Sequence, residues 1–339
     1  MDKNNFDGVR IGLALIVVFA HLSALTQLAD FKPFESIFNS NFAVKGFFAI
    51  SGFLVMKSYL TSNTIADYFE RRVRRIYPAY LMAVLLCLFI GAFATSLNIS
   101  AFFQSKTTLK YLLANATFLN FLQPSLPSTF EGNPMPALNG ALWTIKVEVM
   151  LYFSIPVIFY TFTKFGSIKS SLIIFLFGVA WVYFFTFKFG GTKAEEIARQ
   201  FPAQLSYFVI GSLLATNKKI FSNIKKIVIA SLFLFVLLNN PYLKLFIQPI
   251  FYSVFVIYLS SAAFKNLNLG RYGDISYGIY LYHFPIIQLL IYLGIFKLNE
   301  WIGLCLTLII TISLALLSWH FVEKRFLKRN SHYLVVARN

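Results

Sequence analysis

Apolar residues along this chain are gathered in long runs, which shorter polar stretches separate. A transmembrane helix needs about 20 mostly apolar residues. Runs of this kind occupy residues 9–28, 42–60, 77–96, 141–162, 169–187, 201–216, 225–240, 246–264, 276–296 and 301–322. The pattern predicts an all-α membrane protein with about ten transmembrane helices, in which the runs that begin at 201 and 225 are short enough to be half-inserted or broken.

The longest connection between predicted helices covers residues 97–140. Its middle part, about 109–122, is apolar enough to lie in the membrane interface or to re-enter the bilayer, and Glu131–Pro136 is rich in turn residues. Loops of this length are usually functional or disordered. No internal repeat or separate soluble segment is evident, so residues 1–339 are interpreted as a single transmembrane domain.

The composition excludes a water-soluble globule. The chain is 58% hydrophobic and 13% charged, and it contains 40 Phe and 18 Tyr, whereas soluble proteins carry about 25% charged residues. We therefore expect membrane lipid to surround the apolar surface of this protein. Cys87 and Cys305 both fall within apolar runs, so the sequence offers neither a disulfide framework nor a metal cluster.

The net charge of +17 would suggest nucleic acid as the partner of a soluble protein. Here the basic residues lie between the apolar runs and form no single patch. Of the 30 Lys and Arg residues, 20 fall on the side of the termini, 9 on the opposite side, and Lys146 within a run. Cytoplasmic loops carry such an excess, so both termini are predicted to be cytoplasmic and no nucleic-acid partner is expected.

Two ionisable residues share one face of the first predicted helix. Arg10 and His21 are eleven residues apart, which is about three turns. The rise of about 16 Å puts Arg10 at the cytoplasmic boundary and His21 beyond the midplane, where ionisable groups are costly and usually functional. This geometry suits a long ligand that enters from the cytoplasm. The alternative is an Arg10 that snorkels to the interface and a His21 that pairs with a backbone carbonyl.

Glu148 is a carboxylate about two turns below the extracytoplasmic surface in the run 141–162. A buried carboxylate there needs a partner. Glu148 is expected either to hydrogen-bond to His21 and hold its tautomer, or to form a structural ion pair with Lys45 or Lys146.

The run 276–296 places Ser276, Tyr280 and His283 on one helical face. Tyrosines near a helix end commonly form an aromatic belt. His283 lies deeper than that belt, so we expect it to make a polar contact inside the helix bundle. In the run 42–60, the small residues Gly46, Ser51 and Gly52 permit close approach of a second helix.

Four arginines lie within residues 71–75, just before the run 77–96, and Pro78 suits the first turn of that helix. Positive-inside orientation and attraction to anionic lipid both explain such a cluster. Guanidinium groups also suit bidentate binding of phosphate, so a phosphate-bearing cytoplasmic ligand would fit here.

These stretches, in this order, resemble the acyltransferase 3 family of bacterial multi-pass membrane proteins, whose members acylate surface glycans. The resemblance covers most of the chain. The chain is similar to the stand-alone form of the family, because no periplasmic hydrolase-like domain follows the last run. The residues that carry it are Asp7-Gly8-x-Arg10 with His21, Phe47-Phe48-x-Ile50-Ser51-Gly52-Phe53, Arg72-x-x-Arg75-Ile76-x-Pro78, Trp143 with Glu148, Ser276-Tyr277-x-x-Tyr280-Leu281-x-His283, and Glu323.

The resemblance implies an acyl-CoA donor, usually acetyl-CoA, on the cytoplasmic side and a sugar hydroxyl as acceptor outside. It implies a multi-pass protein of the bacterial cytoplasmic (inner) membrane that acts on a capsule, O-antigen or similar polysaccharide. Arg10, Arg72 and Arg75 are then expected to bind the phosphates of coenzyme A. His21 is expected to act as general base or to be transiently acylated.

Glu148 is expected to orient the His21 imidazole or the acceptor. Ser51, Tyr280 and His283 are candidates for contacts to the substrate or to the developing oxyanion. A transporter or flippase for a lipid-linked glycan or acyl group is the competing function, since polar groups near the midplane also line substrate pathways. A non-catalytic scaffold ranks last, because it gives no reason for Arg10 and His21 to share a face.

Overall fold

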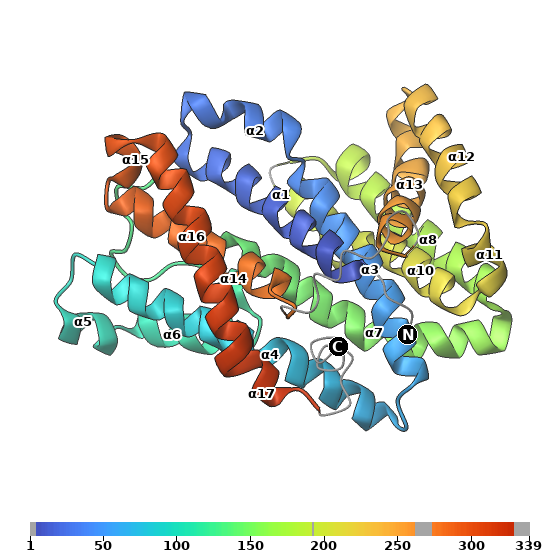
Figure 1. Cartoon of the computed structure of the whole chain (residues 1–339), viewed down its shortest axis with the longest axis horizontal. Coiled ribbons are helices and arrows are strands. Elements are labelled where there is room, and N and C mark those ends of the chain that lie inside the picture. The colour runs from blue at the N-terminus through green and yellow to red at the C-terminus, as the bar shows by residue number, and fades with distance from the viewer. Residues whose placement is uncertain (1–4, 192, 262–272, 329–339) are drawn as a thin grey trace. The chain divides into compact units, whose positions relative to one another are not determined.

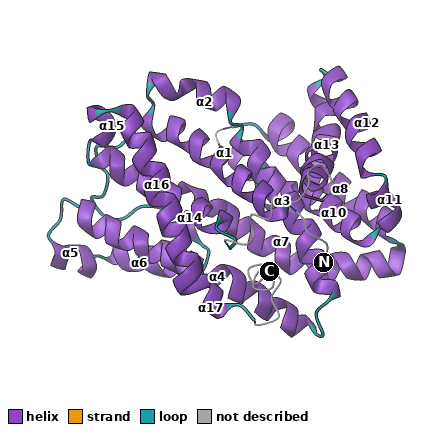
Figure 2. Cartoon of the chain, viewed as in Figure 1, coloured by secondary structure: helices purple, strands orange, loops and turns teal. Residues whose placement is uncertain are grey.

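The computed structural model describes residues 5–191, 193–261 and 273–328, and within these ranges the secondary structure is helical, with no strand (Figures 1 and 2). An isolated bridge joins Thr95 and Thr129. Seven helical segments of the described residues are long and apolar enough to cross a membrane. They are Phe6–Thr26 (α1), Ser40–Leu60 (α3), Ile65–Ala94 (α4), Gly140–Phe165 (η3 and α7), Ser167–Phe189 (α8 and η4), Pro241–Ser261 (α13) and Glu300–Phe326 (α16, η6 and α17).

The other three predicted runs also form helices, but shorter ones. They are α10 (Phe201–Thr216), α12 (Ile224–Leu237) and α14 (Ser276–Tyr292), with 16, 14 and 17 residues. At 1.5 Å per residue these helices reach about 21–26 Å, less than the roughly 30 Å hydrocarbon core. The predicted all-α fold is therefore confirmed, whereas ten spans and cytoplasmic termini stay predictions. Five residues of the basic count, Lys3, Lys265, Arg271, Arg329 and Arg338, lie outside the described residues.

The predicted long connection contains helices of its own. These are α5 (Ile99–Gln104), α6 (Lys106–Ala116) and η2 (Asn120–Leu122). Asn98 and Ser105 begin the first two, because their side chains accept backbone N–H groups of the first turn. The remaining short elements are η1 (Ala29–Phe31), α2 (Lys32–Ile37), α9 (Ala194–Ala198), α11 (Lys218–Ser222) and α15 (Ile295–Leu298).

The helix α4 begins twelve residues before the predicted start, so the prediction for this boundary was wrong. The arginines at 71–75 lie on its early turns, and Pro78 lies inside the helix, not in its first turn. A local cap explains the early start: the Asp67 N–H donates to Thr64 Oγ1 (3.0 Å), while the Asn63 N–H donates to the Asp67 carboxylate (3.3 Å).

The chain forms two compact units. The first contains the described residues of 1–9, 41–69 and 147–268, and the second those of 10–40, 70–146 and 269–339. In the first unit, α3 and α10 cross at Gly52, one of the small residues that the sequence suggested, and at Gly211. A Cβ atom on Gly52 would collide with the Phe208 carbonyl, and one on Gly211 with the Ala49 carbonyl. Close helix approach at Gly52 is thus confirmed.

In the second unit, α14 packs on α16 (Glu300–Ser318). The contact is close at Gly278, where a Cβ atom would lie 2.8 Å from Ala315. Almost every residue of α14 is buried. A helix that is apolar and buried on all sides holds its few polar groups in fixed positions, and these polar groups form the site.

Candidate active site

Two histidines of the second unit contact each other inside the helix bundle. His21 comes from α1 and His283 from α14, and Nδ1 of His21 lies 2.8 Å from Nε2 of His283. The two rings are nearly parallel, with 6° between their planes. His283 is fully buried, and its Nδ1 lies 3.1 Å from the Ile279 carbonyl oxygen, one turn earlier on the same helix. The polar contact expected for His283 is therefore present, and its partner is the histidine of α1.

Aromatic rings enclose this histidine pair. The rings of Phe284 and His21 are in a T-shaped contact, with 5.4 Å between ring centres, and the Tyr280 ring lies 5.9 Å from that of His283. The Tyr280 hydroxyl is hydrogen-bonded to the Thr144 hydroxyl at 2.7 Å. The alternative in which His21 pairs directly with a backbone carbonyl is not what the structure shows, since its Nδ1 faces His283.

Arg10 forms an ion pair with Asp274, with 2.5 Å between Nη1 and Oδ2. Arg75 of α4 forms a second ion pair with the same carboxylate oxygen. The side chain of Arg10 is 14% exposed, so Arg10 does not snorkel into water but is held by a buried acid. Asp274 thus joins a residue of α1 to a residue of α4.

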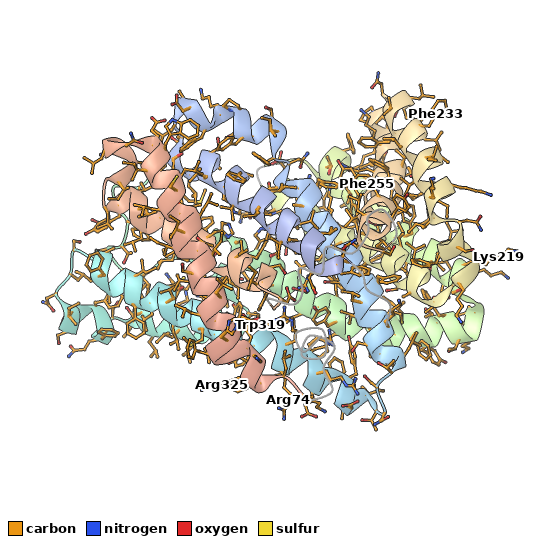
Figure 3. The ribbon with its side chains drawn as sticks, viewed as in Figure 1. Arg74, Lys219, Phe233, Phe255, Trp319 and Arg325 are labelled. Carbon is orange, nitrogen blue, oxygen red and sulfur yellow. The ribbon has the colours of Figure 1, made fainter. Side chains whose placement is uncertain are left out.

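A second carboxylate balances the second arginine. Nη1 of Arg75 lies 2.7 Å from Oε2 of Glu323, which is also buried. The Ser318 hydroxyl donates to the other Glu323 oxygen at 3.1 Å, and the Tyr282 hydroxyl donates to Ser318 at 2.9 Å. The ring of Trp319, labelled in Figure 3, lies 5.9 Å from the Arg75 guanidinium. Two cations and two anions are therefore buried together with balanced charge.

The backbone just before α14 presents Asp274 to the arginines. Gly273 has φ of +96°, and a side chain there would also collide with Trp319, so only glycine fits. The Ser276 hydroxyl donates to Asp274 Oδ1 at 2.6 Å. Burial opposes ionisation of Asp274, but Arg10 and Arg75 outweigh burial and lower the pKa of its carboxyl below the usual 3.8.

Side chains of α1 contact α14 and the residues just before it at two positions along the helix. Arg10 contacts Asp274, and His21 contacts His283. Both numbers rise together along the two helices, so α1 and α14 run parallel. On α1 the two positions are about 16 Å apart at 1.5 Å per residue. The face that Arg10 and His21 share is thus the face that meets α14.

The other arginines of the α4 cluster lie nearer the surface. Arg74 is exposed and donates to Glu70 at 2.8 Å and to the Phe326 carbonyl at 3.2 Å. Lys328 also contacts Glu70, at 2.6 Å. Arg72 is half-buried, three residues before Arg75. Arg75 of this cluster contacts the buried carboxylates of Asp274 and Glu323.

Glu148 and Ser51 belong to the first unit. One oxygen of Glu148 accepts hydrogen bonds from the Ser51 hydroxyl at 3.0 Å and from the Tyr152 hydroxyl at 2.6 Å. Lys45 lies 5.3 Å from the centre of the Tyr207 ring, and within the described residues it forms no ion pair with Glu148. The described partners of Glu148 in this unit are neutral hydroxyl groups, and one of them, Ser51, was a candidate for a contact to the substrate or the oxyanion.

The structure thus brings together Arg10 with Arg75, His21 with His283, and Ser51 with Glu148. Asp274, which contacts both arginines, was not among the residues predicted from the sequence. A signal was available: the chain has only 13 acidic residues, and Asp274 lies two residues before Ser276 of the Ser276-Tyr277 motif. Buried arginines need counter-charges, so each such acid was a candidate partner.

Comparison with known proteins finds a family and several relatives that match nearly the whole chain. The family described as an acyltransferase domain matches residues 3–320. The chain is 26% identical to an O-acetyl transferase of Shigella phage Sf6, covering 98% of both chains. It is 28% identical to nodulation protein 10 of Rhizobium leguminosarum bv. viciae, covering 96% of this chain and 94% of that one. It is 25% identical to the putative peptidoglycan O-acetyltransferase YrhL of Bacillus subtilis, covering 92% of this chain and 54% of YrhL. No solved structure matches significantly.

Proposed function

Because the chain belongs to the acyltransferase 3 family and is a membrane acyltransferase, we propose that it transfers an acetyl group from acetyl-CoA to a hydroxyl of a surface polysaccharide. The observation that carries this proposal is the family match over residues 3–320. The printed names of two relatives, one a phage O-acetyl transferase and one a putative peptidoglycan O-acetyltransferase, support acetyl as the group and a glycan as the acceptor.

The proposed donor enters from the cytoplasm, where the phosphates of coenzyme A suit guanidinium groups. Arg10 and Arg75 are held by Asp274 and Glu323, so a phosphate that binds them must share them with a carboxylate or displace it. Arg72 lies one turn from Arg75 on α4 and is half-buried. We propose that Arg10, Arg72 and Arg75 together bind the phosphates of coenzyme A, and that at Arg10 and Arg75 the phosphate exchanges with their acids.

In the proposed reaction, His21 takes the proton of the acceptor hydroxyl as its oxygen attacks the thioester carbonyl carbon. The carbon–sulfur bond then breaks, and the coenzyme A thiolate takes the proton from His21. Acylation of His21 itself, followed by transfer to the hydroxyl, uses the same residue as nucleophile. Glu148, with Ser51 and Tyr152 hydrogen-bonded to it, offers a carboxylate oxygen for orienting the acceptor.

The proposed place of action is the bacterial cytoplasmic (inner) membrane, with a capsule or O-antigen as acceptor. NMR of the surface polysaccharide tests this directly. Deletion of the gene is expected to remove an acetyl methyl signal, and the plasmid-borne gene to restore it. An unchanged polysaccharide spectrum would contradict the polysaccharide as acceptor.

A pair of histidine variants tests the role of His21. His21→Ala is expected to lower acetyl transfer from labelled acetyl-CoA by about 10²–10⁴-fold, the usual contribution of a general base. His320→Ala is the matched control, because His320 is exposed near the end of α16 and bonds only to the Leu316 carbonyl within the described residues. Both proteins should accumulate in the membrane. Acetylation that survives in His21→Ala would exclude the assigned role.

Proteoliposomes that contain the purified protein and a lipid-linked acceptor, supplied with labelled acetyl-CoA, separate an acyltransferase from a transporter. An acyltransferase consumes labelled acetyl-CoA and labels the acceptor. A flippase would move the lipid-linked acceptor across the bilayer while acetyl-CoA stays intact, and that result would replace the proposed function.

A further inference from the structure

We propose that His283 is a positioning residue that holds His21 in the Nδ1–H tautomer, so that Nε2 of His21 carries the lone pair that accepts the acceptor's proton. The proposal deepens the proposed function and rests on it. Its basis is the direction of two consecutive contacts, from His21 Nδ1 to His283 Nε2 at 2.8 Å and from His283 Nδ1 to the Ile279 carbonyl at 3.1 Å.

The direction follows from what each group can do. A backbone carbonyl only accepts hydrogen bonds, so Nδ1 of His283 is the donor to Ile279. A neutral imidazole has one protonated and one unprotonated nitrogen, so Nε2 of His283 is an acceptor. Nδ1 of His21 must then donate to it. In neutral His21 the lone pair is left on Nε2.

The opposite direction requires a cationic His283. That cation would lie in a fully buried position. The described contacts of His283 are the His21 ring, the backbone of Ile279 and Tyr280, and the rings of Tyr280 and Phe284, with no carboxylate among them. Burying an uncompensated charge is strongly unfavourable, so both rings are neutral in the resting protein.

Packing fixes the geometry on which the tautomer depends. Phe284 follows His283 on α14, and its ring is in a T-shaped contact with His21. The Phe284 ring also lies against Gly140, where a Cβ atom would come within 2.9 Å of it. The nearly parallel rings of His21 and His283 are therefore held in one orientation.

The arrangement also serves the charged stage of the reaction. When Nε2 of His21 takes the hydroxyl proton, the imidazolium keeps its Nδ1–H bond to His283. The lone pair of His283 stabilises that charge without itself accepting the proton. When the carbon–sulfur bond breaks, the coenzyme A thiolate takes this proton from Nε2, and both histidines return to their starting tautomers.

Three variants of His283 separate positioning from simple packing. In His283→Gln the side-chain oxygen reaches about as far as Nε2 and can accept from His21, whereas in His283→Asn the amide is one bond shorter and reaches only the Nδ1 position. His283→Leu removes both groups. We expect Asn and Leu to lower kcat by about 10²-fold with an unchanged KM for acetyl-CoA, and Gln to retain most of the activity. Equal kcat in the Gln and Asn variants would overturn the proposal.

A spectroscopic measurement tests the tautomer without turnover. ¹⁵N NMR of protein labelled at histidine, with His21 assigned by its loss in His21→Ala, reports which ring nitrogen carries the proton. Wild type and His283→Gln are expected to show Nδ1–H, and His283→Asn to lose that preference. Protonation of His21 at Nε2 in the wild type would overturn the inference.

The two proposals fail in different ways. A wild-type protein that acetylates its acceptor but shows the Nε2–H tautomer contradicts the inference alone. A wild-type protein that shows the Nδ1–H tautomer but no acyl transfer contradicts the proposed function, and with it the use of the lone pair.

Discussion

Asp274 forms ion pairs with two arginines that come from different helices. It is 2% exposed and contacts both Arg10 and Arg75. Removing one partner of a buried ion pair costs more than the pair itself contributes, because the remaining charge is left without compensation. The carboxylate is therefore the residue on which the cytoplasmic end of the α1–α14 contact depends.

Replacing this carboxylate is expected to destabilise the protein strongly. Asp274→Asn should lower the free energy of unfolding by about 3–5 kcal/mol, measured as thermal unfolding of the purified protein in detergent. Glu70→Gln is the control, since Glu70 also contacts two basic side chains but is 44% exposed. Its effect should be much smaller. Equal losses in the two variants would contradict the importance of burial.

The stability lost in Asp274→Asn is expected to depend on pH. The pKa of Asp274 is lowered in the folded protein, so its contribution to stability is complete above the ordinary value of 3.8 and disappears as pH falls through the folded value. The difference in unfolding temperature between wild type and Asp274→Asn should therefore be constant from pH 7 to about pH 4 and shrink below it. A difference that grows on acidification would have the wrong sign.

The candidate residues were found from single positions, while their partners were not. Helical spacing alone put Arg10 and His21 on one face, because 3.6 residues per turn is a local property. The pairing of His21 with His283 joins residues 262 positions apart, and no local periodicity encodes such a distance. The roles of these residues in catalysis stay predictions.

At the scale of the element, the crossing of α3 and α10 depends on two glycines. The Gly52 position meets a carbonyl of α10, and the Gly211 position meets a carbonyl of α3. Because backbone atoms cannot move aside as a flexible side chain can, even one added carbon must push the helices apart.

Gly52→Ala is therefore expected to destabilise the first unit by about 1–3 kcal/mol. Gly12→Ala on α1 is the matched control, since nothing lies within 4 Å of a Cβ atom there. Alanine is a better helix former than glycine by about 1 kcal/mol, so the control should be neutral or more stable. Thermal unfolding of both variants in detergent measures the difference, and a neutral Gly52→Ala would refute the close crossing.

Apolar runs located all ten predicted helices and both ends of α10, but not the ends of several others. The ends follow from capping groups and from glycine: α4 starts early at the Thr64–Asp67 cap, and α14 stops at Tyr292, before Gly294 with φ of +72°. Such signals are readable in the sequence, but a hydropathy window averages over them. As a result, α12 ends at Leu237 and α14 at Tyr292, three and four residues before their predicted ends.

For the whole molecule, the topology depends on whether α10 and α12 cross the membrane. If both cross, the connection between them lies in the cytoplasm, as Lys218, Lys219, Lys225 and Lys226 predict. If neither crosses, that connection lies on the outer side. Either way α1 and α14 run in the same direction, as their paired contacts require.

Single cysteines decide this topology. In a protein with Cys87 and Cys305 replaced by alanine, Ser222→Cys is expected to react with a membrane-impermeant maleimide only after the cells are permeabilised. Ser100→Cys, in the predicted outer connection, should react in intact cells. Both serines are exposed. Labelling of Ser222→Cys in intact cells would exclude the ten-span topology.

The sequence by itself determined the all-α membrane class, the positions of the helices and the family. These follow from composition, from runs of apolar residues and from short motifs, all of which are local properties of the chain. Only the tertiary structure decided that Asp274 and Glu323 balance the arginines, and that His283 faces His21. In a chain with so few charged groups, a buried polar residue has few possible partners, but helix packing selects which of them it meets.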